Sequence, residues 1–249
     1  MAAMCGATEN DGVLEIGPGA GVLTLELSDV AKKVAAVELD ARLLPVLAET
    51  LNGCLNVSVI NGDILKLDLD ALLSEQFAGC ERVFVAANLP YYITTPVITR
   101  LLSQSGKITA MTLMVQREVA DRLCAPVGSR ASGAVTVLAH YKSVPELLFD
   151  VPRSCFTPSP RVDSAVIRLT LRERPEFFVG DEEFFFKMVT AAFSQRRKTA
   201  SNSISSGLNI DKGLVEKSLE TVGVPGSIRA EKLSMEELAA LSRELLKII

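Results

Sequence analysis

The chain has 249 residues, of which 48% are hydrophobic and 22% charged, and its mean hydropathy is +0.29. This composition excludes wholesale disorder and a collagen-like chain, and the length suits one large domain or two modest ones. No run approaches the roughly 18 consecutive apolar residues of a membrane span, so a cytoplasmic protein with no membrane partner is expected. The formal charge of −4 argues at first against an anionic partner such as nucleic acid.

Short apolar runs alternate with helical patterns over the first 90 residues, which predicts a parallel sheet built from β-α units. Strands are expected at residues 13–16, 34–39, 57–60, 82–87, 111–115, 146–149 and 164–170. Val135 to Tyr141 fits either a helix or a strand, because a short apolar run does not settle the period. The strand rhythm stops near Pro175, and the helical pattern that follows ends with a helix opened by a capping box at Ser234 to Glu237. We therefore expect an α/β domain over residues 1–174 and a small helical domain over 175–249.

The charge is divided unevenly between the two halves of the chain. Residues 1–152 carry 11 basic and 17 acidic groups, net −6, whereas residues 153–249 carry 15 and 13, net +2. The stretch from Ala191 to Ile210 contains Arg196, Arg197 and Lys198 and no acidic residue, which predicts a basic helix that can contact nucleic acid. The average charge therefore does not exclude such a partner.

A glycine-rich loop and two acids follow the first three expected strands. Gly17 and Gly19 lie in Gly-Pro-Gly-Ala-Gly, where the missing Cβ atoms permit a tight turn and close approach of a ligand to backbone N–H groups. A plain turn is the alternative for this loop alone. Glu38 follows about 20 residues later, where a carboxylate can accept both hydroxyls of a ribose, and Asp63 can accept from an adenine amino group. Together they favour an adenosine-containing ligand without a pyrophosphate.

The sequence Asn88-Leu89-Pro90-Tyr91 follows the fourth expected strand. The exocyclic amine of an aromatic base is a poor nucleophile, because its lone pair is delocalised into the ring. If the Asn88 side-chain oxygen and the backbone carbonyl of Leu89 or Pro90 each accept one N–H, the nitrogen is biased towards a pyramidal geometry. Tyr91 can stack on the base. The alternative is an ordinary turn, since Asn and Pro are common turn residues.

A second aromatic residue, Phe156, lies in a loop stiffened by Pro158 and Pro160, so we expect it to face Tyr91, with Arg161 nearby for phosphate. The lone histidine has no partner pattern for a nucleophilic triad, and the widely spaced cysteines form no Cys-x-x-Cys pair, so no metal is expected. Methyl transfer from a sulfonium donor needs neither a metal nor a histidine base.

These motifs resemble, in order and almost to the end of the chain, the small-subunit ribosomal RNA adenine N6,N6-dimethyltransferases. The matching segments are 13–21, 37–40, 61–63, 88–91, 156–164 and 192–199. The resemblance implies a Rossmann-like sheet with helices on both faces, in an enzyme that dimethylates two adjacent adenines near the 3′ end of the RNA in immature small subunits. It further implies S-adenosyl-L-methionine as cofactor and a monomeric enzyme. Gly17, Glu38, Asp63 and Asn88 would contact the cofactor, Asn88, Tyr91 and Phe156 would hold the adenine, and the basic segment would bind RNA.

Two departures from the family pattern stand out. Only 12 residues precede Val13, so a Gly-Gln-Asn-Phe-Leu-like segment that covers the cofactor is missing, and we expect an N-terminal truncation that weakens cofactor binding. Ser201 stands where relatives often carry another basic residue, which predicts a slightly weaker grip on RNA. Two other functions remain open. One is a large-subunit adenine methylase of the antibiotic-resistance type, and the other is a non-catalytic RNA-binding assembly factor.

Overall fold

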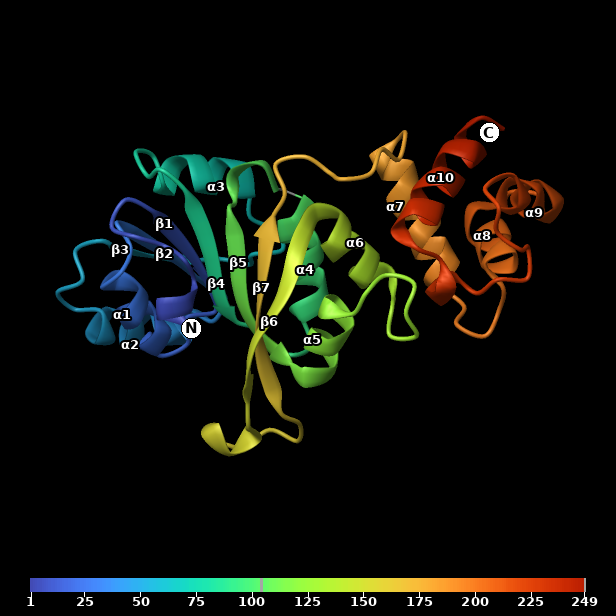
Figure 1. Ribbon diagram of the computed structural model, residues 1–249. Coiled ribbons are helices and arrows are strands. Elements are labelled where there is room, and N and C mark those ends of the chain that lie inside the picture. The colour runs from blue at the N-terminus through green and yellow to red at the C-terminus, as the bar shows by residue number, and fades with distance from the viewer. Residues whose placement is uncertain (104, 249) are drawn as a thin grey trace. The chain divides into compact units, whose positions relative to one another are not determined.

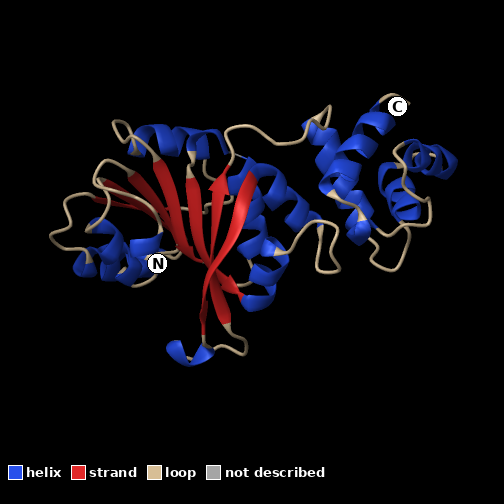
Figure 2. Ribbon diagram, viewed as in Figure 1, coloured by secondary structure: helices blue, strands red, loops and turns tan. Residues whose placement is uncertain are grey.

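The computed structural model describes residues 1–103 and 105–248, and these form two compact units. The first unit comprises residues 1–120 and 143–173, and the second comprises residues 121–142 and 174–249. Figures 1 and 2 show a sheet with flanking helices in the first unit and a group of helices in the second. Within the described residues, none of the helices has the length and apolar character that crossing a membrane requires.

The expected strands are all present, with ends shifted by at most a few residues. They are β1 (Gly12–Ile16), β2 (Lys33–Glu38), β3 (Val57–Asn61), β4 (Val83–Asn88), β5 (Ala110–Gln116), β6 (Ser143–Val151) and β7 (Ser164–Leu171). The helices are α1 (Val22–Ser28), α2 (Leu44–Thr50), α3 (Leu69–Gln76), α4 (Thr94–Ser103), α5 (Arg117–Cys124), α6 (Ala134–Lys142), α7 (Glu182–Phe193), α8 (Ala200–Leu208), α9 (Lys212–Thr221) and α10 (Met235–Leu246). Short 3-10 turns η1 (Ala2–Met4), η2 (Ala41–Leu43), η3 (Ser105–Lys107), η4 (Arg153–Cys155) and η5 (Ala230–Lys232) complete the assignment.

The seven strands form one sheet in the order β3-β2-β1-β4-β5-β7-β6. Strands β1 to β5 are parallel to one another, whereas β7 runs antiparallel to both β5 and β6. β1 is buried at every residue and β4 at all but its last, because layers on both faces cover the central strands of a parallel sheet. The Rossmann-like α/β fold expected from the sequence is thus confirmed.

Strands β6 and β7 form a hairpin, and its connecting loop lies at the edge of the sheet where the parallel strands end. Ser164, the first residue of β7, pairs with Gln116, the last residue of β5. The loop of residues 152–163 therefore lies at the carboxyl ends of the parallel strands. Figure 1 shows this hairpin, in yellow, extending beyond the other strands.

The second unit is helical and has its own apolar core. Val137 and Tyr141 of α6 belong to this core, and the Tyr141 ring lies 5.3 Å from that of Phe185 in α7. Residues 121–142 therefore group with the C-terminal helices, which differs from the predicted ranges of 1–174 and 175–249. The ambiguous stretch around Val137 is helical because residues four apart share a helix face, and that face packs on α7.

Candidate active site

The strand order reverses between β1 and β4, and open α/β sheets bind ligands outside the carboxyl ends of the strands at such a point. Gly17 directly follows β1, and Glu38 and Asn88 are the last residues of β2 and β4. Asp63 lies two residues after β3. Four of the predicted site residues thus gather at one edge of the sheet, although they are up to 71 positions apart in the sequence.

The loop after β1 adopts a backbone conformation that favours glycine. Gly17 and Gly19 have φ angles of 70° and 58°, in the left-handed region that residues with a Cβ rarely adopt. A Cβ built on either residue would have no heavy atom within 4 Å, so open space borders the loop. A ligand can therefore approach the backbone closely at both positions.

Glu38 ties this loop to the end of β2. One carboxylate oxygen accepts a hydrogen bond from the Gly19 N–H at 3.2 Å, and the other accepts one from the Asp40 N–H at 2.8 Å. The side chain is buried, and each carboxylate oxygen still has a second lone pair. Glu38 can therefore fix the loop and accept from a ligand hydroxyl at the same time.

A cavity of about 390 Å³ lies beside the loop, within the range usual for small-molecule sites. Its walls include the predicted residues Gly17, Glu38, Asp63 and Pro90. A larger cavity, of about 820 Å³, is lined by residues such as Phe77, Arg82 and Lys107, which precede β4 and β5. That larger cavity is at the opposite edge of the sheet, so the smaller one is the candidate site.

Glu15 of β1 is a buried acid outside the set of predicted site residues. It precedes Ile16, which lines the cavity, and its side chain is 1% exposed. The pKa of Glu15 is raised to about 7, mainly by burial; the Thr24 hydroxyl lowers it and the nearby charge of Glu38 raises it. Within the described residues, one of its carboxylate oxygens has no hydrogen-bond partner.

The segment after β4 is held by backbone hydrogen bonds. The Pro90 carbonyl accepts from the Ile93 N–H and from the Thr94 hydroxyl, both at 3.1 Å. Within the described part of the chain, by contrast, the Leu89 carbonyl accepts no hydrogen bond. Asn88 is exposed at the end of its strand. Of the two carbonyls considered from the sequence, that of Leu89 is therefore the available acceptor.

Tyr91 is positioned by a residue that the sequence analysis did not single out. Its hydroxyl lies 2.9 Å from the hydroxyl of Ser164, which is buried at the start of β7. These residues are 73 positions apart, and only the antiparallel placement of β7 next to β5 brings them together. Sequence periodicity carries no signal for such a contact.

The loop of residues 152–163 carries Phe156, which is half-buried, and Arg161, which is exposed. The loop is closed by the Asp163 carboxylate, which accepts from the Arg153 N–H at 2.9 Å. Tyr91 and Phe156 make no ring contact among the described residues, so the expected face-to-face placement stays a prediction for the substrate-bound state. Arg153, also exposed, is a further cation of this loop.

The predicted basic helix is wrong in its conformation. Arg196, Arg197 and Lys198 are exposed, but they lie in the turn between α7 and α8, because the Lys198 N–H bonds to the Gln195 carbonyl and Thr199 caps the next helix. None of the three forms an ion pair with any residue that the structure describes. All three charges are therefore available to an anionic partner.

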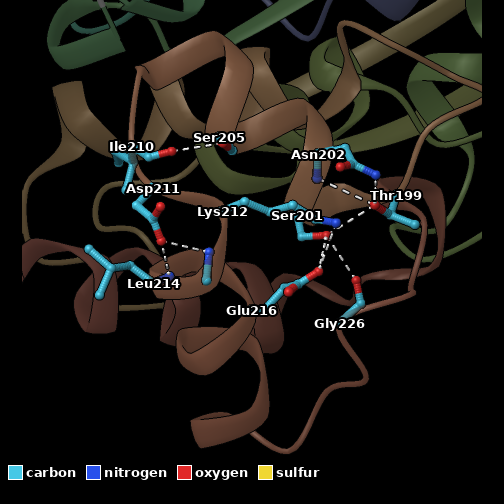
Figure 3. Close-up of polar contacts among 11 residues, drawn as sticks. Thr199, Ser201, Asn202, Ser205, Ile210, Asp211, Lys212, Leu214, Glu216 and Gly226 are labelled. Carbon is cyan, nitrogen blue, oxygen red and sulfur yellow. Dashed lines mark hydrogen bonds and ion pairs between the residues drawn. The ribbon is translucent and has the colours of Figure 1, made fainter.

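Ser201 lies just after this turn and points into the second unit. It is fully buried, and its hydroxyl contacts the Gly226 carbonyl at 3.0 Å and the Glu216 carboxylate at 3.4 Å (Figure 3). A serine here connects α8 to α9 and to the loop after α9. Its effect on RNA binding stays a prediction.

Comparison with known proteins decides the family. The family model for ribosomal RNA adenine dimethylase matches residues 3–247. The chain belongs to this ribosomal RNA adenine dimethylase family. It is 45% identical to ribosomal RNA small subunit methyltransferase A of Bacillus licheniformis, over 98% of this chain and 85% of that protein. It is 46% identical to the protein of the same name from Geobacillus thermodenitrificans, over 98% and 84%.

Two crystal structures resemble this adenine dimethylase over nearly their whole length. A dimethyladenosine transferase from Plasmodium falciparum has a TM-score of 0.76 at 25% identity, covering 98% of this chain and 93% of that one. The 23S rRNA methyltransferase ErmE has a TM-score of 0.70 at 29% identity, covering 98% and 94%. Both units therefore have counterparts in these two transferases.

The residues around the cavity fit S-adenosyl-L-methionine, the cofactor of this family. Open space beside Gly17 and Gly19 lets a ligand approach the backbone of the loop closely, and Glu38 and Asp63 supply acceptors for hydroxyl and amino groups. These groups match a ligand that carries a ribose, an amine and a positive charge.

Proposed function

We propose that this protein is the S-adenosyl-L-methionine-dependent enzyme that dimethylates N6 of two adjacent adenines near the 3′ end of small-subunit rRNA. One observation carries the proposal. The glycine loop, Glu38, Asp63 and the segment Asn88 to Tyr91 meet at one sheet edge, in a chain 45% identical to a small-subunit methyltransferase. The greater identity to small-subunit enzymes than to the large-subunit enzyme ErmE, at 29%, favours the small subunit as substrate.

When bound, S-adenosyl-L-methionine would supply an electrophilic methyl group. Its transfer would form the bond from the adenine N6 lone pair to carbon, break the methyl C–S bond with the electron pair going to sulfur, and release one N6 proton to water. The protein has to bind both partners in line and make the N6 lone pair available. Gly17, Gly19, Glu38 and Asp63 bind and orient the donor.

Asn88 and Leu89 prepare the nucleophile. The Asn88 side-chain oxygen and the Leu89 carbonyl each accept one N–H of the adenine amino group, which favours a pyramidal nitrogen with an available lone pair. The Pro90 carbonyl is engaged by Ile93 and Thr94 and instead fixes the backbone of this segment. The acceptors are therefore in place before the substrate arrives.

Tyr91 and Phe156 hold the adenine ring. Tyr91 offers one stacking surface, fixed by its bond to Ser164, and Phe156 offers another from the hairpin loop. A stacked base contributes about 1–3 kcal/mol per aromatic contact. Arg161 of the same loop binds an adjacent phosphate.

The second unit binds the rest of the RNA. Arg196, Arg197 and Lys198 contact phosphates, since they are exposed and unpaired within the described residues. The enzyme acts as a monomer on immature small subunits in the cytoplasm, where that substrate is made, and it uses no metal.

The test is transfer of labelled methyl groups to isolated small and large ribosomal subunits that lack this modification. We expect label on the small subunit only, recovered as N6,N6-dimethyladenosine. The matched variant Asn88→Ala should lose about 100-fold in rate, the scale seen when one stabilising hydrogen bond is removed from a preorganised site. Equal rates with and without Asn88 would remove its assigned role.

The same assay separates the two other functions. Label on the large subunit alone identifies the antibiotic-resistance type of methylase. RNA binding without detectable cofactor binding or label identifies a non-catalytic assembly factor.

A further inference from the structure

Tyr92 is an exposed aromatic residue at the wall of the cofactor cavity that has no role in the function described so far. Its side chain is 81% exposed, although it lines the cavity together with Glu38 and Asp63. Leu39, which is 62% exposed, lines the same cavity. Two large apolar surfaces therefore face solvent at a site where a ligand would cover them.

The backbone turn at the end of β4 separates the two adjacent tyrosines. Tyr91 and Tyr92 are the central residues of a turn closed by the hydrogen bond from the Ile93 N–H to the Pro90 carbonyl. Tyr91 reaches β7, where it bonds to Ser164, whereas Tyr92 lines the cavity formed with β2 and β3. Tyr92 therefore lies on the donor side of the turn, and Tyr91 on the side of the hairpin loop.

The spacing of the strands leaves room for a planar ring. Leu39 follows β2 and Tyr92 follows β4, and these are the two neighbours of β1 in the sheet. Strands two places apart are separated by roughly 10 Å, which accommodates a flat ring between side chains that lean towards it. Asp63, at the end of the next strand, can accept from an amino group on such a ring.

We propose that Tyr92 is a positioning residue of the donor site that stacks on the purine ring of the cofactor and closes the open side of the cavity. This inference rests on the function proposed above, because it assigns the adenosine part of S-adenosyl-L-methionine to this cavity. The Tyr92 ring supplies dispersion and π-stacking with the adenine face and excludes water from the hydrogen bonds at Glu38 and Asp63. Tyr92 touches no atom that reacts.

The first test measures binding of S-adenosyl-L-methionine and of adenosine by calorimetry. Tyr92→Ala should raise both dissociation constants about tenfold, and Tyr92→Phe should change them by less than about threefold, because the phenyl ring keeps the stacking surface. Leu55→Ala is the control, since Leu55 is a fully exposed apolar residue of the same unit that does not line the cavity.

The second test uses the intrinsic fluorescence of the protein, which contains three tyrosines and no tryptophan. Adenosine binding should quench part of the tyrosine emission of the unmodified protein. In Tyr92→Phe the affinity is kept, but most of this quenching should disappear. A residue that only supported the fold would not separate affinity from quenching in this way.

Steady-state kinetics with the small ribosomal subunit complete the design. For Tyr92→Ala the KM for the cofactor should rise about tenfold while kcat at saturating cofactor changes by less than about twofold. Unchanged cofactor affinity with a raised KM for RNA would place the stack on the substrate base and overturn the proposal. If the unmodified protein binds no cofactor, the proposed function itself is overturned. If the unmodified protein binds the cofactor and Tyr92→Ala binds it equally well, only the proposed stacking of Tyr92 is overturned.

Discussion

Glu15 is a buried carboxylate whose protonation affects the stability of the fold. In the unfolded chain its pKa is near the ordinary 4.5, and in the folded protein burial raises the pKa to about 7. The folded state therefore binds the proton more tightly than the unfolded state. The free energy of unfolding falls as the pH rises from about 4.5 to 7, and the full cost of burying the charge is present above pH 7.

We predict that Glu15→Gln stabilises the ligand-free protein at alkaline pH. The amide has a similar shape and no charge, so its advantage over the glutamate should grow between pH 5 and pH 8, by up to about 3 kcal/mol from the shift in pKa. Urea unfolding at a series of pH values measures it. Glu26→Gln removes an exposed carboxylate from α1 as a control. Parallel stability curves for Glu15→Gln and the unmodified protein would contradict the prediction.

Ser164 gives a second prediction at the residue scale. Removing its hydroxyl in Ser164→Ala frees the Tyr91 ring without removing it. We expect kcat to fall by about tenfold, with the KM for the cofactor nearly unchanged, because only the orientation of the base is affected. Tyr91→Phe, which loses the same hydrogen bond from the other side, should give a similar loss. A combined variant should show little additional loss, since both changes remove one interaction.

The sequence predicts the position of a candidate site residue only where that residue lies at or just after the end of a strand. The position of Glu38 and Asn88 at one edge of the sheet could be predicted because the carboxyl ends of parallel strands lie at the same edge. The contact of Tyr91 with Ser164 could not, because it depends on which strand pairs with β5. The sequence also does not tell which of the Leu89 and Pro90 carbonyls is free to accept a hydrogen bond from a ligand. The structure distinguishes them, because the Pro90 carbonyl already accepts from Ile93 and Thr94.

At the scale of elements, long sequence patterns with clear capping residues were sufficient to predict helices, and short apolar patterns were not. The capping box at Ser234 is present, and α10 begins at Met235 as predicted. Helix α3 was not expected, although Asp68 caps it, because its eight residues carry only a short apolar pattern. The composition of the basic segment predicts a helix, but the segment forms a turn because Thr199 caps a new helix immediately after it.

Ser201 provides the prediction for this scale. Ser201→Ala removes the buried hydrogen bond that joins α8 to the Gly226 carbonyl, so the free energy of unfolding should fall by about 1 kcal/mol. Ser206→Ala, on the exposed side of the same helix, is the matched control and should change stability by less than about 0.5 kcal/mol. RNA affinity should be the same for both variants. A selective loss of RNA binding in Ser201→Ala would instead assign the serine to the interface.

At the scale of the whole molecule, the charge follows the two units. The first unit carries 12 basic and 18 acidic residues, net −6, and the second carries 14 and 12, net +2. Dividing the sequence after residue 152 gives the same two net charges, because residues 121–142 and residues 153–173, which change sides between the two divisions, each carry a net charge of +2. The sequence therefore predicts the sign of the net charge of each unit but not the boundary between them. Net charge is a sum along the chain, whereas membership of a unit depends on contacts such as that of Tyr141 with Phe185.

We predict that Arg196→Glu combined with Arg197→Glu weakens RNA binding and flattens its dependence on salt. Each phosphate contact that is lost should lower the slope of log affinity against log salt by about 0.7 to 0.9. Filter binding of a small-subunit RNA fragment at several salt concentrations measures this slope. Arg174→Glu with Lys217→Glu makes the same change in net charge elsewhere on the second unit and should leave the slope nearly unchanged. Equal slopes for both pairs would show that the phosphates bind at another surface.

The antiparallel direction of β7 has a consequence for how such enzymes can diverge. Because β6 and β7 form a hairpin, the loop of residues 152–163 begins and ends at the same edge of the sheet, and its length can change without moving any other strand. Longer loops add little entropic cost, about 0.6 kcal/mol for each doubling of length. If this loop contacts the RNA as proposed, relatives can differ in its length and sequence, and so in the RNA that they recognise, while the parallel strands and the loops that follow them stay the same.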